Sequence, residues 1–419
     1  MNQMRIRFDS ETSIPRSWLI DNEEKAQHIL AKYKNADIHP HCECSENKPK
    51  MYIAFRHRYY LARNPGTGSM HAPDCPSFEL DDADSGKTSY ENNVIRNKPD
   101  GSMSIKILAP LSQKAVDRAE RAETDIDAKA PPPAPRKPGE KREGMSLSGL
   151  MAFLWEEAEL NRWYPSFGGK RTWYVARKRL MDAAQRIVTK RQNLSDVLYM
   201  PEFFNEKDKD AIEARRIETF NRIMKNTSST NKYMVVIGSI RKMNIQSDAV
   251  SIMLGHQKDS IKYWGGKHIV RKLEASPVPS IVEDENGLKL VYTMMVISRD
   301  DNDVLHIRDI GFLPVDIRMI PSYTDEDLEI SDRLVVEQRT FIKTLRYDGF
   351  REKVLPEHLL VDTGETATPM AIFRNFASEA EIEERFKAQK RWKETFGQYW
   401  IWDMEKQGSE IPPFPKKAD

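Results

Sequence analysis

The pattern of apolar and polar positions divides the chain into segments with different expected structures. Three short runs of aromatic and branched residues predict strands in the first quarter of the chain, at 51–55, 59–63 and 104–108. From residue 146 to about 224, apolar residues instead recur at the spacing of a helix. Residues 117–144 are rich in Ala, Glu, Lys and Pro. Because they hold almost no large apolar side chain, we expect a flexible or partly polyproline linker.

The second half of the chain alternates between strand and helix patterns. Strands are expected at 234–237, 288–297, 304–313, 359–361 and 370–373. Helices are expected from about 324 to 346 and from 378 to about 396, where Ser378 and Glu381 have the spacing of a capping box. No internal repeat is visible, and the proline-rich end from residue 411 is expected to be a loose tail.

These patterns predict a multidomain α+β protein. Its 419 residues are enough for two or three hydrophobic cores. The expected parts are a β-rich module at 1–110, a linker at 111–144, a helical region at 145–230, an α/β domain at 231–405 and a tail at 406–419.

Charge and composition limit the classes of partner. The chain holds 65 basic and 64 acidic residues, so any contact with nucleic acid must use a local patch. The first eight residues lack the apolar core of a signal peptide, and the apolar stretch at 288–297 is too short to span a bilayer. An odd number of clustered cysteines argues against disulfides. We therefore expect a cytoplasmic protein that does not enter a membrane.

All three cysteines lie in one stretch that also holds a histidine. Cys42 and Cys44 are one residue apart, and His71 and Cys75 follow as a second pair four positions apart. Three thiolates and an imidazole are a common tetrahedral ligand set for Zn²⁺. Four protein ligands leave no open position, so we expect a structural zinc site in the first module. The alternative is three unrelated buried thiols and a surface histidine. Other candidates for the fourth ligand are His39, His41 and His57.

The helical region contains a locally basic segment at 171–191. Its basic residues are Arg171, Arg177, Lys178, Arg179, Arg186, Lys190 and Arg191. One interpretation is a solvated helix face. The other is a surface that contacts the phosphates of DNA or RNA, with nearby aromatic side chains for stacking.

The C-terminal part resembles the PD-(D/E)xK nuclease fold. The resemblance rests on the order helix, strand, turn, strand, helix between 324 and 396, with Pro356-Glu357 before one strand and Asp362 after it. It implies a restriction-endonuclease-like α/β domain in which acids and a lysine converge on Mg²⁺ or Mn²⁺. Ala371 and Phe373, however, stand where the motif has its second acid and its lysine.

We therefore expect an inactive site, with one alternative. A metal-dependent nuclease would need rearranged carboxylates from Glu337, Glu357 and Asp362. Glu337 falls on the apolar stripe of its expected helix, where a carboxylate needs a metal or, more simply, an arginine as partner. The candidates for a displaced lysine are Lys387 and Lys390. For Glu357 and Asp362 the simpler interpretation is turn capping and surface charge.

Most of the chain also resembles a bacterial family of unknown function whose members have a similar length and often occur on conjugative or integrative elements. The matching features are the two ligand pairs, the segments 63–68, 154–163, 198–201 and 355–357, and Trp400-Ile401-Trp402-Asp403. The preferred hypothesis is a nucleic-acid-associated protein of a mobile element, with structural zinc and an inactive nuclease-like domain. The alternatives are the metal-dependent nuclease and a scaffold that binds only proteins.

Overall fold

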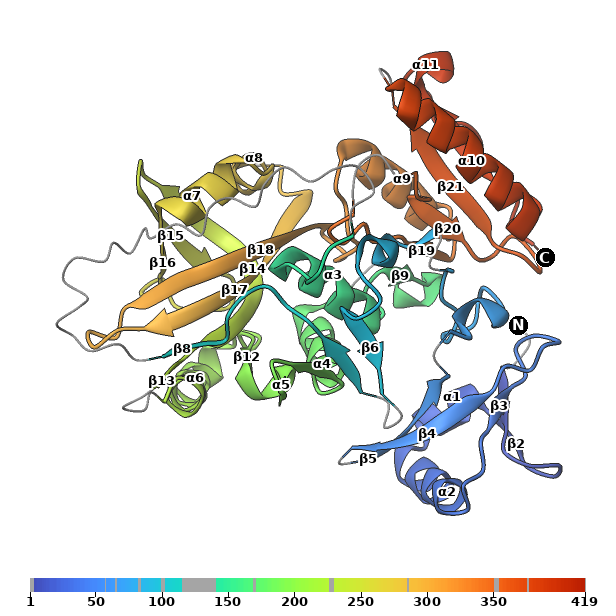
Figure 1. Cartoon of the computed structure of the whole chain (residues 1–419), viewed down its shortest axis with the longest axis horizontal. Coiled ribbons are helices and arrows are strands. Elements are labelled where there is room, and N and C mark those ends of the chain that lie inside the picture. Colours follow the sequence, from blue (N-terminus) through green and yellow to red (C-terminus); the bar gives the residue numbers. More distant parts are fainter. Residues whose placement is uncertain are drawn as a thin grey trace.

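The computed structural model describes residues 4–56, 58–64, 66–81, 84–98, 102–114, 141–168, 171–225, 230–284, 286–349, 354–374 and 377–418. An N-terminal module, a central barrel with helices packed around it, and a C-terminal sheet with one long helix can be followed in Figure 1. Most of the predicted linker lies outside the described residues, as does His57. Among the described residues, no helix is both long and apolar enough to cross a bilayer.

The N-terminal module contains strands and helices. Its elements are β1 (Arg5–Arg7), β2 (Ser13–Pro15), α1 (Arg16–Asp21), α2 (Glu23–Asn35), β3 (His41–Cys42), β4 (Met51–Arg56) and β5 (Arg58–Arg63). β1 pairs with β2 and β3, and β4 and β5 form the predicted hairpin. Helix α2 was not predicted. It buries Ala26, Leu30 and Tyr33 on one face, so the module is α+β.

The next part joins segments on both sides of the predicted linker. Its strands are β6 (Ile95–Asn97), β7 (Met103–Ile105), β8 (Ser112–Lys114), β9 (Arg162–Trp163), β10 (Ile187–Thr189), β11 (Gln192–Asn193), β12 (Leu198–Tyr199) and β13 (Thr230–Lys232). Its helices are α3 (Leu147–Glu157), α4 (Trp173–Ala184), α5 (Leu194–Val197) and α6 (Lys209–Ile223). Because β7 pairs in parallel with β10, the segment before residue 110 belongs to this part.

A closed barrel follows. Its strands are β14 (Met234–Ile245), β15 (Ala249–Leu254), β16 (Tyr263–Gly266), β17 (Lys289–Arg299) and β18 (Leu305–Asp316), with α7 (Lys267–Glu274) and α8 (Val278–Glu283) between β16 and β17. The order is β14-β15-β16-β18-β17, and β17 pairs again with β14. All neighbours are antiparallel except β16 and β18. The long β14 closes the barrel because its first half pairs with β17 and its second half with β15.

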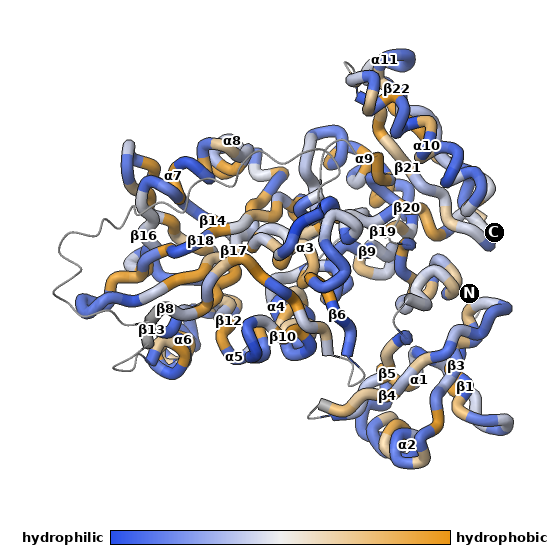
Figure 2. The backbone as a smooth tube through the Cα atoms, in the orientation of Figure 1, coloured by the Kyte–Doolittle hydropathy of each residue, from blue (hydrophilic) through white to orange (hydrophobic). Residues whose placement is uncertain are grey.

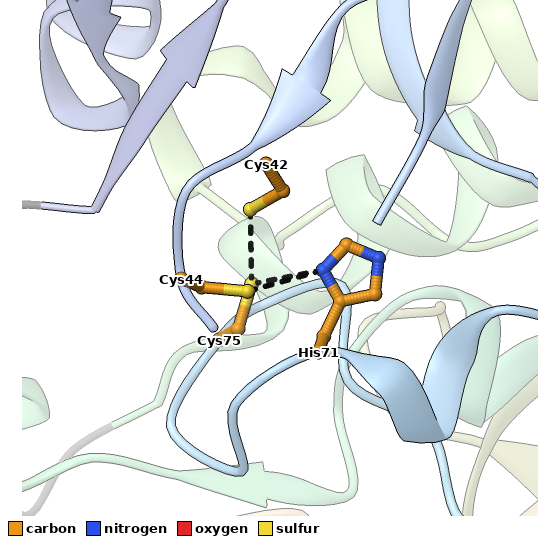
Figure 3. A group of neighbouring side chains, drawn as sticks. All are labelled: Cys42, Cys44, His71 and Cys75. Carbon is orange, nitrogen blue, oxygen red and sulfur yellow. Dashed lines mark hydrogen bonds between the residues drawn. The ribbon is translucent and has the colours of Figure 1, made fainter. Parts of the chain in front are cut away.

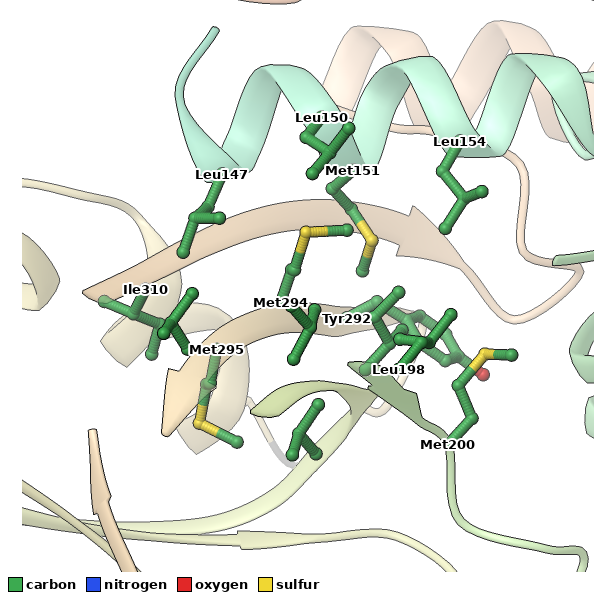
Figure 4. Packing of buried hydrophobic residues seen from close by; sticks show 14 of the residues in the cluster. Leu147, Leu150, Met151, Leu154, Leu198, Met200, Tyr292, Met294, Met295 and Ile310 are labelled. Carbon is green, nitrogen blue, oxygen red and sulfur yellow. The ribbon is translucent and has the colours of Figure 1, made fainter. Parts of the chain in front are cut away.

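Helix α3 packs directly on the barrel. Figure 4 shows its apolar side chains facing those of β17 and β18, and the hydropathy colours show apolar residues along the same strands (Figure 2). Residues 149–155 of this helix are all buried, as expected for a helix that is apolar on every side. Gly311 of β18 permits the close approach, because a Cβ there would overlap the backbone of Leu147 and Ser148.

The C-terminal sheet has the order β9-β19-β20-β21-β22. Its elements along the chain are α9 (Asp325–Val336), β19 (Phe341–Lys343), β20 (His358–Leu360), β21 (Thr368–Phe373), α10 (Glu379–Phe396) and β22 (Trp400–Asp403), followed by α11 (Met404–Gln407). The strands from β9 to β21 are antiparallel neighbours, whereas β22 runs parallel to β21 after the α10 crossover. Residues 231–405 thus form two sheets, the barrel and this one.

Two local expectations differ from the structure. The helix expected to reach residue 346 ends at Val336, because Gln338 takes a left-handed conformation and β19 begins at Phe341. The end of the chain is packed, not loose. Ile411 is buried, and the Trp400 indole donates to the carbonyl of Pro413.

Candidate metal centre

Cys42, Cys44, His71 and Cys75 come together in the N-terminal module (Figure 3). Cys42 ends β3, and Cys44 lies in the turn that follows. His71 directly follows a short 3-10 helix, Gly68–Met70, and Cys75 lies in the next turn. One potential ligand atom from each residue lies within 4.8 Å of all the others. The arrangement can hold a metal ion such as zinc.

The distances in the cluster fit a tetrahedral site. The sulfurs of Cys42 and Cys75 are 3.8 Å apart. The Nδ1 atom of His71 lies 3.3 Å from the Cys44 sulfur and 3.6 Å from the Cys75 sulfur. A tetrahedron with Zn–S bonds of about 2.3 Å and a Zn–N bond of about 2.0–2.1 Å has edges of roughly 3.8 Å between sulfurs and 3.6 Å between sulfur and nitrogen. These three distances are thus close to the edges of such a tetrahedron, and all four atoms lie within 4.8 Å of one another.

Donors around the cluster favour a thiolate at Cys75, whereas hydrogen bonds to neighbouring sulfurs and burial raise the pKa of Cys42 and of Cys44 above the ordinary value. The backbone N–H of Ala72 donates to the Cys44 sulfur, and that of Ser77 donates to the Cys75 sulfur, both at 3.4 Å. The Cys42 and Cys44 thiols, which point toward Cys75, lower the pKa of Cys75 well below its ordinary value. Such outer contacts orient metal ligands and tune their basicity.

The turn that carries the first two cysteines is anchored through Glu43. Its carboxylate accepts hydrogen bonds of 2.6 Å from Arg7 and from the Ser13 hydroxyl. Arg16, just after β2, donates to the Ser77 hydroxyl at 2.8 Å. The ligand turns are therefore tied to β1 and β2, an arrangement that the cysteine spacing alone did not reveal.

The two alternative histidines that the structure describes, His39 and His41, do not join the cluster. His41 is exposed, and its Nδ1 lies 2.9 Å from the carbonyl of Lys48. His39 is also exposed and lies outside the cluster. The Nε2 atom of His71 is buried and has no hydrogen-bond partner among the described residues. Its Nδ1 atom is the one that points at the sulfurs.

The three candidate catalytic carboxylates do not gather. Among the described residues, the group of four described above is the only set of three or more potential metal ligands. Glu337 is the exposed C-cap residue of α9, so the expected place on the apolar stripe is wrong. Its partner is Arg333, at 3.1 Å, which is the arginine salt bridge named as the simpler interpretation.

Asp362 is held by a different arginine. Arg339 contacts both of its carboxylate oxygens, at distances of 2.8–3.2 Å. The backbone N–H of Thr340 also donates to this carboxylate, at 2.8 Å. With these donors around it, Asp362 holds the turn after β20 against the start of β19.

Glu357 is buried beside three cations. The Nζ atom of Lys343 lies 3.1 Å from its carboxylate, Arg374 lies 3.4 Å from it, and Arg346 also donates to it. Burial alone would raise the pKa of Glu357, but the charges of Lys343, Arg346 and Arg374 hold it well below its ordinary value. The carboxylate is therefore ionised and neutralised by side chains of this chain.

The same lysine contacts a second buried acid, Asp327 of α9, also at 3.1 Å. Burial raises the pKa of Asp327 above its ordinary value, although the charge of Lys343 opposes the shift. Asp327 and Lys343 were not among the predicted site residues. The one signal in the sequence is a lysine inside the apolar run at 341–345, which places a charge on a buried strand.

The two positions that depart from the nuclease motif belong to the core. Ala371 and Phe373 are buried and pack against Ala388 and Trp392 of α10. The candidate replacement lysines are exposed on α10. Lys387 pairs with Glu383, and Lys390 with Glu394.

The basic segment at 171–191 divides into two sets. Arg171, Arg177, Arg179 and Arg186 contact carbonyl groups or acids of the same part of the protein. Lys178, Lys190 and Arg191 are exposed and have no ion-pair partner among the described residues. Four of the seven basic residues therefore have contacts within the protein, and the three exposed cations are compatible with either interpretation of the segment.

His358, next to Glu357 in β20, leads to a pH prediction. Burial, and then the charge of Lys343, lowers the pKa of His358 well below its ordinary value of about 6.5. His358 therefore binds a proton more tightly in the unfolded chain than in the folded chain. The stabilisation that comes from neutral His358 is complete above about pH 6.5 and is lost as the pH falls. In urea titrations between pH 7 and 5, we expect this group to remove up to about 1.4 kcal/mol of unfolding free energy per pH unit.

The matched variant is His358→Gln, which keeps a polar partner for the Ser331 hydroxyl, 2.8 Å from the ring. Its unfolding free energy should depend less steeply on pH than that of the unaltered chain. Equal slopes in the two proteins would contradict the assignment. Loss of metal at low pH affects both proteins and cancels in the comparison.

Comparison with known proteins identifies the family. A family model described as "Protein of unknown function (DUF1173)" matches residues 14–405. No curated protein and no solved structure matches the chain. The matched range includes the four cluster residues and the C-terminal sheet with its buried charges. The chain belongs to the DUF1173 family.

Proposed function

We propose that this chain is a nucleic-acid-binding protein with a structural zinc ion and a nuclease-like C-terminal domain that does not cleave. The observation that carries the binding proposal is the distribution of charge. Residues 171–272 hold 21 basic and 10 acidic side chains, whereas the whole chain has a net charge of only +1. The region of α4, α6 and the first three barrel strands thus carries a local positive charge that the rest of the chain balances.

Many of these basic side chains face solvent. Lys178, Lys190 and Arg191 have been described above, and Lys258 and Lys262 beside the barrel are also exposed without an ion-pair partner in the described part of the chain. Unpaired surface cations attract phosphates, and they release counterions when phosphates bind. This arrangement supports a polyanionic partner better than it supports a purely protein-binding scaffold.

Zinc is the ion that best suits the cluster. Its three sulfurs and one imidazole nitrogen match a closed tetrahedral Zn²⁺ site in ligand type, number and spacing. Carboxylate-preferring ions such as Mg²⁺ and Ca²⁺ do not suit thiolate ligands. With no position left for water or substrate, the ion would stabilise the fold of the module and take no part in chemistry.

The proposal of a nuclease-like but inactive domain rests on the C-terminal sheet. The succession α9-β19-β20-β21-α10-β22, with three antiparallel strands and a parallel fourth, supports this proposal, although the predicted order had two strands, not three, between the helices. Lys343 lies between the buried carboxylates of Asp327 and Glu357, where a nuclease would need a divalent ion. An ammonium group cannot activate water as a metal does, so we expect no cleavage. The link to a mobile element remains part of the same proposal.

The test is a binding and cleavage experiment with purified, zinc-loaded full-length protein. We expect labelled DNA or RNA to bind at low salt, with an affinity that falls steeply as salt rises. Lys190→Glu with Arg191→Glu should weaken binding several-fold, whereas Lys387→Glu with Lys390→Glu, on the distant helix α10, should not. With Mn²⁺ present, denaturing gels should show intact nucleic acid.

Other outcomes would replace the proposal. The absence of binding to any nucleic acid at low salt, together with a stable protein complex, would favour the scaffold. Mn²⁺-dependent cleavage that disappears in Asp362→Ala would favour the nuclease with rearranged carboxylates. Because Asp362 is paired with Arg339, its substitution is otherwise expected to lower stability alone.

A further inference from the structure

The barrel has the strand order and strand directions of an OB-fold. With β14 to β18 taken as strands one to five, the order around the barrel is one-two-three-five-four and back to one. The third and fifth strands are parallel, and helices α7 and α8 lie between the third and the fourth. OB-folds bind oligonucleotides and oligosaccharides on the face of their second and third strands. This likeness concerns the fold alone, so a function must be argued from the residues on that face.

The residues on the outer face of β15 and β16 follow from the strand register. Asn244 of β14 lies opposite Ser251, Ser251 lies opposite Trp264, and Trp264 lies beside His306 of β18. Their sequence neighbours Ile252 and Tyr263 are fully buried inside the barrel. The row Asn244-Ser251-Trp264-His306 therefore lies on the face of these strands that points away from the barrel interior. Asn244 and Trp264 are exposed on this face, His306 is half-buried and Ser251 is covered.

Trp264 is exposed without a structural partner. Its relative exposure is 42%, although tryptophan is among the side chains most often covered in folded proteins. No ring contact and no hydrogen bond involves its indole among the described residues, in contrast to Trp155, Trp173 and Trp392. The packing of the barrel does not account for this side chain, so a flat aromatic surface is left open to solvent.

The unpaired charges around Trp264 are positive, as the binding of phosphate groups requires. Lys242 of β14 and Lys262, two residues before Trp264, are exposed and have no ion-pair partner in the part of the chain that the structure describes. The outward strand positions of this face carry no carboxylate. Four acids in the loops beside it are already paired: Asp248 with Lys267, Asp259 with Arg241, Asp300 with His306, and Asp303 with Arg299.

We propose that the β15–β16 face binds single-stranded nucleic acid, with a base stacked on Trp264 and neighbouring phosphates on Lys242 and Lys262. An unpaired base offers a face for such stacking, whereas the bases of a duplex already stack on one another. Neutral oligosaccharides gain nothing from two unpaired cations, so the charges favour the nucleic acid. This inference rests on the proposed function and specifies its binding site.

The experiment measures fluorescence anisotropy of a labelled oligothymidylate of about 15 nucleotides, long enough for one barrel. Binding to full-length, zinc-loaded protein should weaken about tenfold or more in Trp264→Ala and less than about threefold in Trp264→Phe, which keeps a stacking ring. The control is Phe386→Ala, which removes an exposed aromatic side chain on α10 and should bind as the unaltered chain does. A duplex of the same length should compete poorly.

The lysines have their own readout. Lys242→Ala with Lys262→Ala should reduce the slope of log affinity against log salt by about 1.4, the expected value for two phosphate contacts on a single strand. Normal affinity in Trp264→Ala, with binding lost in Lys190→Glu/Arg191→Glu, would overturn this inference and leave the proposed function intact. No binding of any nucleic acid by the unaltered chain would overturn both. Circular dichroism of each variant establishes that it is folded.

Discussion

A Cys75→Ser chain is expected to bind no zinc at neutral pH, and its N-terminal module is expected to lose its structure. Cys75 is buried, and its sulfur lies within 3.8 Å of both Cys42 and His71, so no other side chain can replace it. An ion bound to the four residues would join two turns that are otherwise held mainly by short strands. Since metal affinity in such modules is part of the folding free energy, losing it is expected to cost several kcal/mol. Elemental analysis measures the zinc, and hydrogen exchange measures the structure.

The loss of structure should reach a particular part of the C-terminal sheet. The core of the module includes Ile342 and Leu359 of that sheet and Val361 just after β20, together with Cys42 and Cys75. Amide protection should therefore fall in residues 4–81 and along β19 and β20, while the barrel keeps its protection. Chelation of zinc from the unaltered protein should give the same exchange pattern without any substitution.

The matched control is His39→Ala, because His39 is exposed and lies outside the cluster. It should retain one equivalent of zinc and the melting temperature of the unaltered chain. A Cys75→Ser protein that also retains both would contradict the site. If the unaltered protein contains no zinc and the Cys75→Ser protein is still less stable, the buried thiols stabilise the module by packing alone.

The spacing of residues predicted this cluster well because its ligands come in two local pairs. A turn brings Cys42 close to Cys44, and another brings His71 close to Cys75, so only one long-range contact had to be assumed. The β4–β5 hairpin, β17, β18 and α10 were also visible, since each is a continuous run with one clear period.

The closed barrel could not be predicted in the same way. β16 reads Tyr263-Trp264-Gly265-Gly266, and its two glycines are typical of a turn. It becomes a strand because β15 and β18 pair with it from either side, and Gly265 admits Ile269 of α7, which a side chain there would obstruct. Such long-range pairing overrides local preference.

The contacts between the buried charges also depend on long-range pairing and could not be predicted from the sequence. Glu357 stood out as an acid beside a proline, but a sequence does not reveal which cation will face it. Asp327 and Lys343 come from a helix and a strand whose contact depends on the complete sheet. The predicted end of α9 had the largest effect on this part of the prediction. A helix that extends to residue 346 leaves no room for β19, which is the strand that carries Lys343.

Lys343→Met is expected to destabilise the C-terminal sheet strongly. The lysine is fully buried, and its ammonium lies 3.1 Å from both Asp327 and Glu357. Methionine fills a similar volume but leaves two buried carboxylates with less positive charge around them. Breaking a buried ion pair from one side typically costs about 3–5 kcal/mol, whereas Lys387→Met on the surface of α10 should change stability by less than about 0.5 kcal/mol. Urea unfolding at pH 7 compares the two variants.

Asp327→Asn provides the decisive second substitution. Glu357 keeps Arg346 and Arg374 when Lys343 is lost, so the acid left most poorly compensated is Asp327. Adding Asp327→Asn to Lys343→Met should therefore restore part of the lost stability, and the two effects should be coupled by about 0.5–3 kcal/mol. Strictly additive effects would mean that the lysine acts through its packing. If Mn²⁺ stabilised the Lys343→Met chain and not the unaltered one, the ammonium would be occupying a position that a divalent ion can take, and the absence of cleavage would follow from that occupancy.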